Sequence, residues 1–128
     1  MSTTPPDSTF GMDNSAAEDS LIDIAYLNEI TGGDAELRTE LIDMFESETV
    51  IQLAGIKTHF VSSEVEQLKQ AIHKYRSSLF SVGLLKTASK YKEIETALKR
   101  NETVENLGTK LLNLEQESMD ALQLLKNF

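Results

Sequence analysis

The sequence predicts an all-α protein, an antiparallel up-down four-helix bundle with a short additional N-terminal helix. Three observations indicate this fold. Apolar residues recur at spacings of three and four from about residue 20 onward, as they do on one face of an amphipathic helix. No proline follows Pro6, so no later position carries this helix breaker. Only short polar or glycine-containing stretches separate the periodic segments, and short connections make consecutive long helices antiparallel neighbours.

The first two predicted helices lie at residues 20–30 and from residue 35 to about 60. Gly32 and Gly33 end the first helix, whose apolar face consists of Leu21, Ile24, Leu27 and Ile30. Asp34 is a good N-cap for the second helix, because its carboxylate can accept hydrogen bonds from the free backbone N–H groups of the first turn. The predicted apolar stripe of this long helix consists of Leu37, Leu41, Met44, Phe45, Ile51 and Ile56.

The third predicted helix carries a histidine and is bounded by two local signals. Ser63 and Glu66 have the spacing of a capping box at its start, and Gly83 is suited to the residue just after its end. Its apolar residues are separated by three and four positions and define one buried stripe: Val65, Leu68, Ile72, Tyr75, Leu79 and Val82. Two further helices are expected, from residue 84 or 85 to 100 and from 104 to 125.

Length and composition indicate one domain preceded by a tail. A chain of 128 residues with 40% hydrophobic and 26% charged residues is typical of a single globular unit. Residues 1–19 are rich in Ser, Thr, Pro, Asp and Gly and are predicted to be disordered, which leaves residues 20–128 for the bundle. The beginning of the sequence lacks the basic and apolar parts of a secretory signal, and no apolar run is long enough to span a membrane. We therefore expect a cytoplasmic protein without membrane contact.

The charge is strongly negative but unevenly distributed. The net charge of −9 argues against nucleic acid as a partner. Residues 65–100, however, contain eight Lys or Arg and three Glu, so this third of the chain is positive. The sequence has no cysteine, and two histidines are too few for most zinc sites, so no metal is expected. The basic region surrounds one of those histidines, His73.

His73 is the strongest candidate for chemistry. It lies about 100° from the buried stripe around the helix, and Lys69, Arg76 and Ser77 share its face. A neutral imidazole has one nitrogen with a free lone pair that can attack phosphorus, and the neighbouring cations could balance a phosphoryl group. No acid lies close to His73 on its own helix face to orient the ring or to bind Mg²⁺. The chain therefore has a nucleophile but lacks a complete active site, which a partner must supply.

These residues resemble the phosphoacceptor helix of histidine-containing phosphotransfer (HPt) domains. The matching positions of the motif are His73, Arg76, Ser77, Ser78 and Gly83. The stretch YLNEITGGDAELRTELIDMF (residues 26–45) is similar to the first two helices of the family, and EIETALKR (93–100) to the end of its fourth helix. The resemblance covers roughly residues 21–125. Two positions differ, because Ser77 stands where glycine is usual and Arg76 where lysine is commoner.

The resemblance implies a carrier in a multistep phosphorelay. His73 would accept a phosphoryl group from a receiver-domain aspartyl phosphate and pass it to another receiver, of a hybrid histidine kinase or a response regulator. Such a protein is not an enzyme: it has no kinase or phosphatase activity and no cofactor of its own, since the receiver holds Mg²⁺. The unit is expected to be monomeric, either free-standing or part of a hybrid kinase.

The expected site combines the phosphoacceptor with a binding surface. Arg76, Lys69 and Ser77 are predicted to stabilise the phosphoryl group. Partner docking is assigned to Phe80, which lies outside the buried stripe two turns beyond the histidine, and to Lys74 and Gly83. The alternative is a helical interaction module on the same fold that binds receivers or other partners without phosphotransfer.

Overall fold

The fold is described from a computed structural model of the chain, covering residues 21–127. This part is helical and has no strand; its helices are α2 (Ile24–Thr31), α3 (Ala35–Val61), α4 (Val65–Ser81), α5 (Leu85–Lys99) and α6 (Leu107–Lys126). The prediction of an all-α bundle with a short additional helix is confirmed. The predicted tail at residues 1–19 lies outside the described residues.

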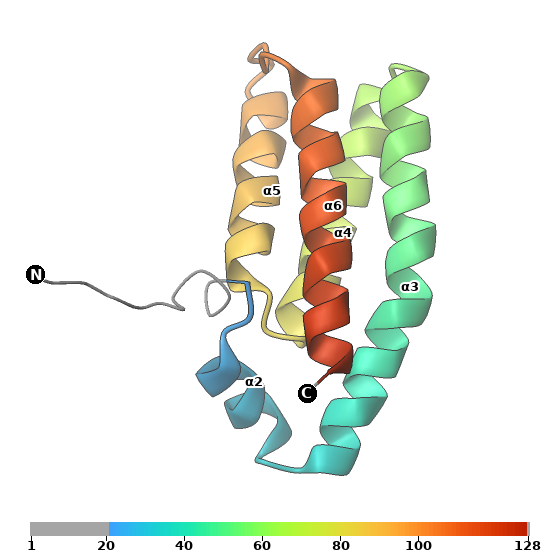
Figure 1. The fold of residues 1–128 in the computed structure, drawn as a ribbon. Coiled ribbons are helices and arrows are strands. Elements are labelled where there is room, and N and C mark those ends of the chain that lie inside the picture. Colours follow the sequence, from blue (N-terminus) through green and yellow to red (C-terminus); the bar gives the residue numbers. More distant parts are fainter. Residues whose placement is uncertain (1–20, 128) are drawn as a thin grey trace, which may run out of the picture.

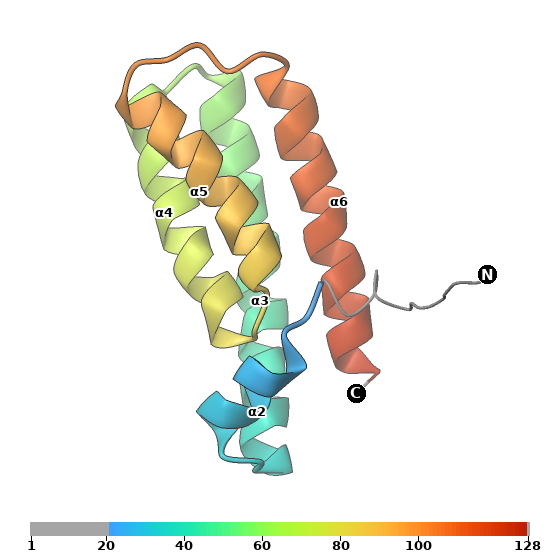
Figure 2. The ribbon, with the colours of Figure 1, turned by 90° about the vertical axis from the view of Figure 1, so that its left-hand side faces the viewer.

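The four long helices form an antiparallel up-down bundle (Figures 1 and 2). Each helix packs beside the one before it, and α6 closes the bundle against α3. The N-terminal part of α3 extends beyond the other long helices, and the short α2 lies beside it at this end of the molecule (Figure 2). None of the helices in residues 21–127 is long and apolar enough to cross a membrane.

The core is formed by one apolar face from each helix. On α4 the predicted stripe is correct except for its first member, because Val65 is 46% exposed. On α3 the prediction is wrong for Leu37, Met44 and Ile51, which are exposed. The contacts of α3 with α4 on one side and α6 on the other place a different face inward, with the buried residues Ile42, Phe45, Thr49, Leu53 and Ile56. Long amphipathic helices with apolar residues on two faces leave this choice to packing.

The helix ends follow the predicted signals in three of four cases, and Gly32 ends α2 with a positive φ of 61°. The side chain of Asp34 accepts hydrogen bonds from the backbone N–H groups of Glu36 and Leu37, at 2.9 and 3.2 Å, as expected. At the start of α4 the predicted capping box is wrong. Ser63 has a positive φ of 57°, and the N-cap is Glu64, whose side chain makes no capping hydrogen bond.

Gly83 ends α4 and also fixes α2. Its φ is +79°, and the N–H groups of Gly83 and Leu84 bond back to the carbonyls of Phe80 and Leu79, which is a Schellman motif. The carbonyl of Gly83 accepts the N–H of Asp23 at 2.8 Å, and a Cβ on Gly83 would lie 3.0 Å from the Asp23 carbonyl oxygen. The absence of a side chain therefore allows the start of α2 to pack against the end of α4.

Two tyrosines occupy the centre of the bundle. We expect tyrosines in a helical core to bring their hydroxyls to the surface, but Tyr75 and Tyr91 are both completely buried. Their rings contact each other edge to face, with the ring centroids 5.4 Å apart. The Tyr75 hydroxyl forms a 2.5 Å hydrogen bond with Thr49, whereas the Tyr91 hydroxyl has no partner among the described residues. Burial raises the pKa values of both phenols.

Candidate functional site

His73 lies on the solvent side of α4, next to the buried Ile72. Its side chain is 65% exposed, whereas Ile72 has no accessible surface. The predicted position of His73 off the buried stripe is therefore confirmed. Because α4 is fixed in the bundle by Leu68, Ile72 and Leu79, the helix presents the imidazole from a rigid support.

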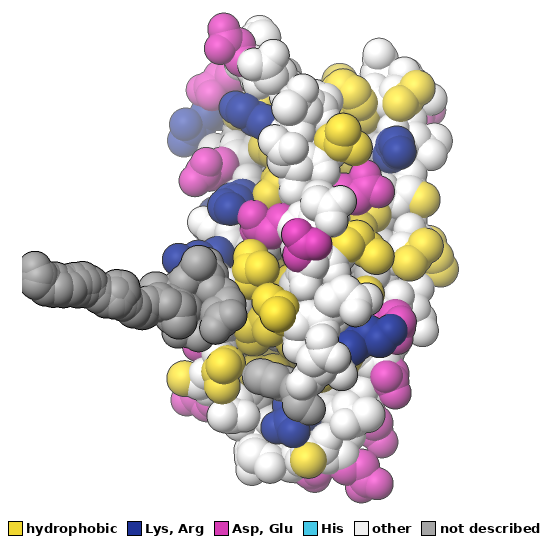
Figure 3. Space-filling view, in the orientation of Figure 1, with side chains coloured by type: hydrophobic (Ala, Val, Ile, Leu, Met, Phe, Trp, Pro, Cys, Tyr) yellow, Lys and Arg dark blue, Asp and Glu magenta, His cyan; other side chains and the backbone are white. Residues whose placement is uncertain are grey.

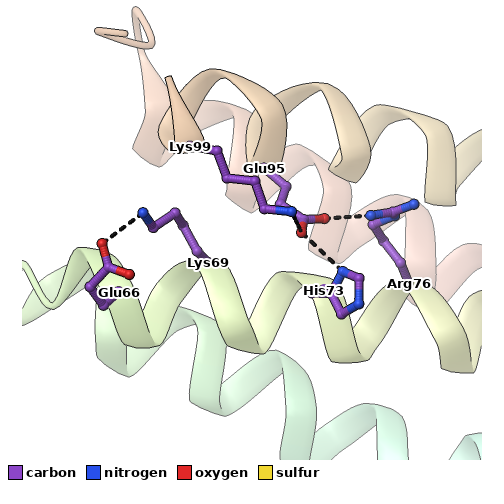
Figure 4. A network of polar contacts seen from close by, with 6 residues as sticks. All are labelled: Glu66, Lys69, His73, Arg76, Glu95 and Lys99. Carbon is purple, nitrogen blue, oxygen red and sulfur yellow. Dashed lines mark hydrogen bonds and ion pairs between the residues drawn. The ribbon is translucent and has the colours of Figure 1, made fainter. Parts of the chain in front are cut away.

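A buried carboxylate on the neighbouring helix holds the imidazole. Glu95 of α5 is only 2% exposed, and its Oε2 lies 3.0 Å from Nδ1 of His73 (Figure 4). The helix that carries His73 offers no acid for this role, and the carboxylate comes from a different helix. A signal was present in α5, where Glu95 falls on the buried face with Ala88, Tyr91 and Leu98. A lone acid at a buried position requires partners, and these partners lie on α4 and α5.

Two cations share Glu95 with His73. Arg76 Nη1 lies 2.5 Å from Oε1, and Lys99 Nζ lies 3.0 Å from Oε2. Burial raises the pKa of Glu95, but hydrogen bonds from Lys99, Arg76 and His73 outweigh this effect and hold the pKa below its ordinary value. Glu95 is therefore a carboxylate at neutral pH. It accepts the hydrogen bond of His73, so we assign the ring proton to Nδ1.

This arrangement leaves the other ring nitrogen free to react. With the proton on Nδ1, the lone pair is on Nε2, at the edge of the ring facing away from Glu95 (Figure 4). A carboxylate that fixes the tautomer and orientation of a histidine also stabilises the positive charge that the ring acquires when Nε2 bonds to an electrophile. This arrangement can therefore support nucleophilic attack by Nε2.

A shallow depression lies beside His73. Its volume is about 310 Å³, and it is lined by Glu66, Lys69, Gln70, His73, Glu95 and Lys99. Lys69 lies one helical turn before His73 and its side chain is 15% exposed. Its ammonium group pairs with Glu66 at 2.7 Å and points away from Glu95 (Figure 4). The exposed Lys99 borders the same depression from α5. Lys99 was not among the predicted site residues.

The remaining predicted residues lie around this centre in different settings. Ser77 and Lys74 are exposed on α4, and Phe80 is 38% exposed, as expected for a residue outside the core stripe. Ser78 points instead toward α3, where its hydroxyl donates to Gln52 at 3.2 Å. Gly83, which was assigned to partner docking, is buried against Asp23 and Leu27 at the start of α2 and is not exposed to a partner.

The second histidine and the acidic residues suggest no other centre. His59 pairs with Glu64 at 2.8 Å at the turn between α3 and α4, outside the network of Glu95. Residues 21–127 contain no group of three or more His, Asp or Glu side chains placed to hold a metal ion.

The fold and this exposed, carboxylate-bound histidine can be compared with known proteins. The sequence gives no match to models of protein families or to curated proteins. The structure, however, is similar to the HPt domain of the Hpt sensor hybrid histidine kinase from Shewanella, with a TM-score of 0.72. The match covers 84% of this chain and 92% of that domain at 22% sequence identity. The chain therefore has the fold of an HPt domain.

Proposed function

We propose that this protein is a phosphohistidine carrier of a multistep relay. In this proposal, His73 accepts a phosphoryl group from the aspartyl phosphate of one receiver domain and passes it to another receiver. The observation that carries the proposal is the exposed His73 imidazole, whose Nδ1 is held by the buried carboxylate of Glu95. The likeness in fold to an HPt domain supports the same class of function.

The transfer follows from the tautomer of His73. Nε2 attacks the phosphorus atom of the aspartyl phosphate, an N–P bond forms, and the bond between phosphorus and the carboxylate oxygen breaks. The aspartate leaves as a carboxylate, and the ring, still protonated on Nδ1, becomes positively charged beside Glu95. The reverse steps with the aspartate of a second receiver complete the exchange. The chain emerges unchanged, so it acts as a stoichiometric carrier and not as an enzyme.

The cations near His73 would stabilise the transferred group. Lys69 and Lys99 border the depression beside the ring, and Ser77 and Arg76 follow one turn along α4. Arg76 is largely engaged by Glu95, so we assign to it both the stabilisation of the phosphoryl group and the positioning of the carboxylate. The receiver brings Mg²⁺ and the acidic residues that bind it, and this chain needs no cofactor of its own.

A receiver would dock over His73 in the cytoplasm, where relay receivers obtain their phosphoryl groups. Phe80 is the expected apolar anchor, and Lys74 is an exposed cation on the same helix. Ile24 and Ile30 of α2 are 43% and 39% exposed and can extend the apolar surface. A single chain contains all of these residues, so one copy is the unit that exchanges phosphoryl groups.

The test is phosphorylation by receivers. The chain is incubated with Mg²⁺ and isolated receiver domains carrying a radioactive aspartyl phosphate, and the label is checked for acid lability and base stability. His73→Gln should abolish labelling, whereas His59→Gln, the matched control, should retain it. His73→Gln should change the free energy of unfolding by no more than about 0.5 kcal/mol, because the side chain is exposed. Label that persists in His73→Gln contradicts the proposal, and receiver binding without any label favours the interaction module.

A further inference from the structure

A second surface lies between α3 and α6, and nothing in the proposed relay uses it. Two rows of residues with the same spacing of four, three and four border this boundary: Val50, Ala54, Lys57 and Val61 on α3, and Gly108, Leu112, Glu115 and Met119 on α6. Val61, Val50 and Leu112 are 73%, 59% and 57% exposed. Figure 3 shows hydrophobic side chains gathered along this boundary in the upper half of the molecule.

A groove runs through this surface. Its volume is about 150 Å³, and its lining is mainly apolar: Leu53, Ile56, Lys57, Phe60, Val61, Tyr91, Gly108, Leu111, Leu112 and Glu115. Gly108 lets α6 approach the ring of Phe60, since a Cβ there would lie 3.1 Å from two ring carbons. The groove is large enough for one aliphatic or aromatic side chain of a partner, which is the usual form of a binding hot spot.

Lys57 and Glu115 carry opposite charges at this groove, and neither has an ion-pair partner in residues 21–127. Neither side chain forms a hydrogen bond with another residue of that range. A twofold axis that brings two such surfaces together can place Lys57 of each copy against Glu115 of the other. An isologous contact requires this kind of self-complementarity, because the same surface patch faces itself.

We propose that two copies of this chain associate through the α3/α6 surface. Lys57 of one copy pairs with Glu115 of the other, and apolar side chains such as Leu112 cover the partner's groove. Because α3, α4, α5 and α6 follow one another around the bundle, this surface lies away from the α4/α5 face that carries His73 (Figure 1). Both phosphoacceptor sites therefore stay accessible, and the inference is independent of the proposed function.

The size of the surface sets the strength of this contact. The eleven residue steps from Val50 to Val61 span about 17 Å, and two adjacent helices are about 20 Å wide, which gives a few hundred Å² per copy. Stable dimers bury roughly 800 Å² per partner, so this association is reversible and depends on concentration. The monomer expected from the sequence is then the state of the dilute protein.

Sedimentation equilibrium of the full chain tests the proposal, at concentrations from about 10 μM to 1 mM, a range that covers weak association. The wild type should shift from monomer to dimer. Lys57→Glu and Glu115→Lys should each weaken association at least about tenfold, because each places like charges opposite one another. An equimolar mixture of the two variants should form heterodimers, since the reversed charge of each variant then faces an opposite charge on the other.

The controls keep folding and general charge effects apart from the contact. Lys92→Glu is a matched charge reversal at an exposed position of α5, and it should leave association unchanged. Far-UV circular dichroism checks that each variant is folded, and Leu112→Ser gives a second disruption that leaves the charges in place. A wild type that stays monomeric at the highest concentration overturns the proposal. Single charge variants that dimerise like the wild type, or a mixture that does not associate, overturn it equally.

Discussion

Replacing Glu95 should affect both the stability and the reactivity of the site. Glu95→Ala removes the shared acceptor of His73, Arg76 and Lys99. Breaking a buried ion pair costs about 3–5 kcal/mol, because the remaining charge is left without a partner. Here Lys99 and His73 are 61% and 65% exposed and regain water, so the cost comes chiefly from Arg76, which is 16% exposed. We expect the free energy of unfolding to fall by about 2–3 kcal/mol.

Glu95→Gln separates the charge of this residue from its shape. One amide oxygen can still accept from Nδ1 of His73, but the amide NH₂ group then faces the Arg76 guanidinium, donor against donor. The free energy of unfolding of Glu95→Gln should therefore fall by about 1–2 kcal/mol. Glu93→Gln, on the exposed face of the same helix, is the matched control and should change the free energy of unfolding by less than about 0.5 kcal/mol.

The pH dependence of stability tests whether the folded chain favours the charged form of Glu95. Its pKa is lower in the folded chain than the ordinary value of 4.5, so the folded state favours the carboxylate. The stabilisation is complete above pH 4.5 and is lost as the pH falls through the lower pKa of the folded state. The difference in unfolding free energy between wild type and Glu95→Gln, measured by urea titration, should therefore shrink in strongly acidic solution.

Phosphoryl transfer should report the orientation of His73. In Glu95→Ala the ring loses its acceptor, and we expect the rate of labelling by phosphorylated receivers to fall about tenfold or more. The ¹⁵N shifts of the His73 ring should show a proton on Nδ1 in the wild type and a mixture of tautomers in the variant. An unchanged tautomer and labelling rate in a folded Glu95→Ala chain would refute the assignment of Glu95 as the group that positions His73.

Two further variants test the surroundings of the site. Phe80→Ala should weaken receiver binding, measured by calorimetric titration, by about 1 kcal/mol or more without unfolding the bundle. Ile51→Ala, at a more exposed position of α3, is the control and should leave receiver binding unchanged. Equal losses of binding in the two variants would exclude Phe80 as the anchor. Gly83→Ala should lower the free energy of unfolding by about 2 kcal/mol, because φ is positive and the new Cβ meets the Asp23 carbonyl. The matched Gly55→Ala, in an open helical position of α3, should be neutral or stabilising, and a similar loss in both variants would contradict this explanation.

The sequence by itself determined the class of fold and the position of His73 relative to the core. Helical periodicity along one segment depends on local spacing alone, so the stripe from Leu68 to Val82 put His73 outside the core, and the structure agrees. The Asp34 cap and the positive φ of Gly83 could also be predicted, because a cap or a C-terminal glycine acts within a few residues of its own position.

The tertiary structure decided which side chains meet across helices. Glu95 is distant from His73 in sequence, and only the packing of α5 on α4 brings its carboxylate to the ring together with Arg76 and Lys99. The same kind of packing chose the inward face of α3 and left Met44 and Ile51 exposed. A helix repeats its pattern along one axis, whereas the rotation of each helix about that axis is set by its neighbours, and the sequence of one segment does not contain that information.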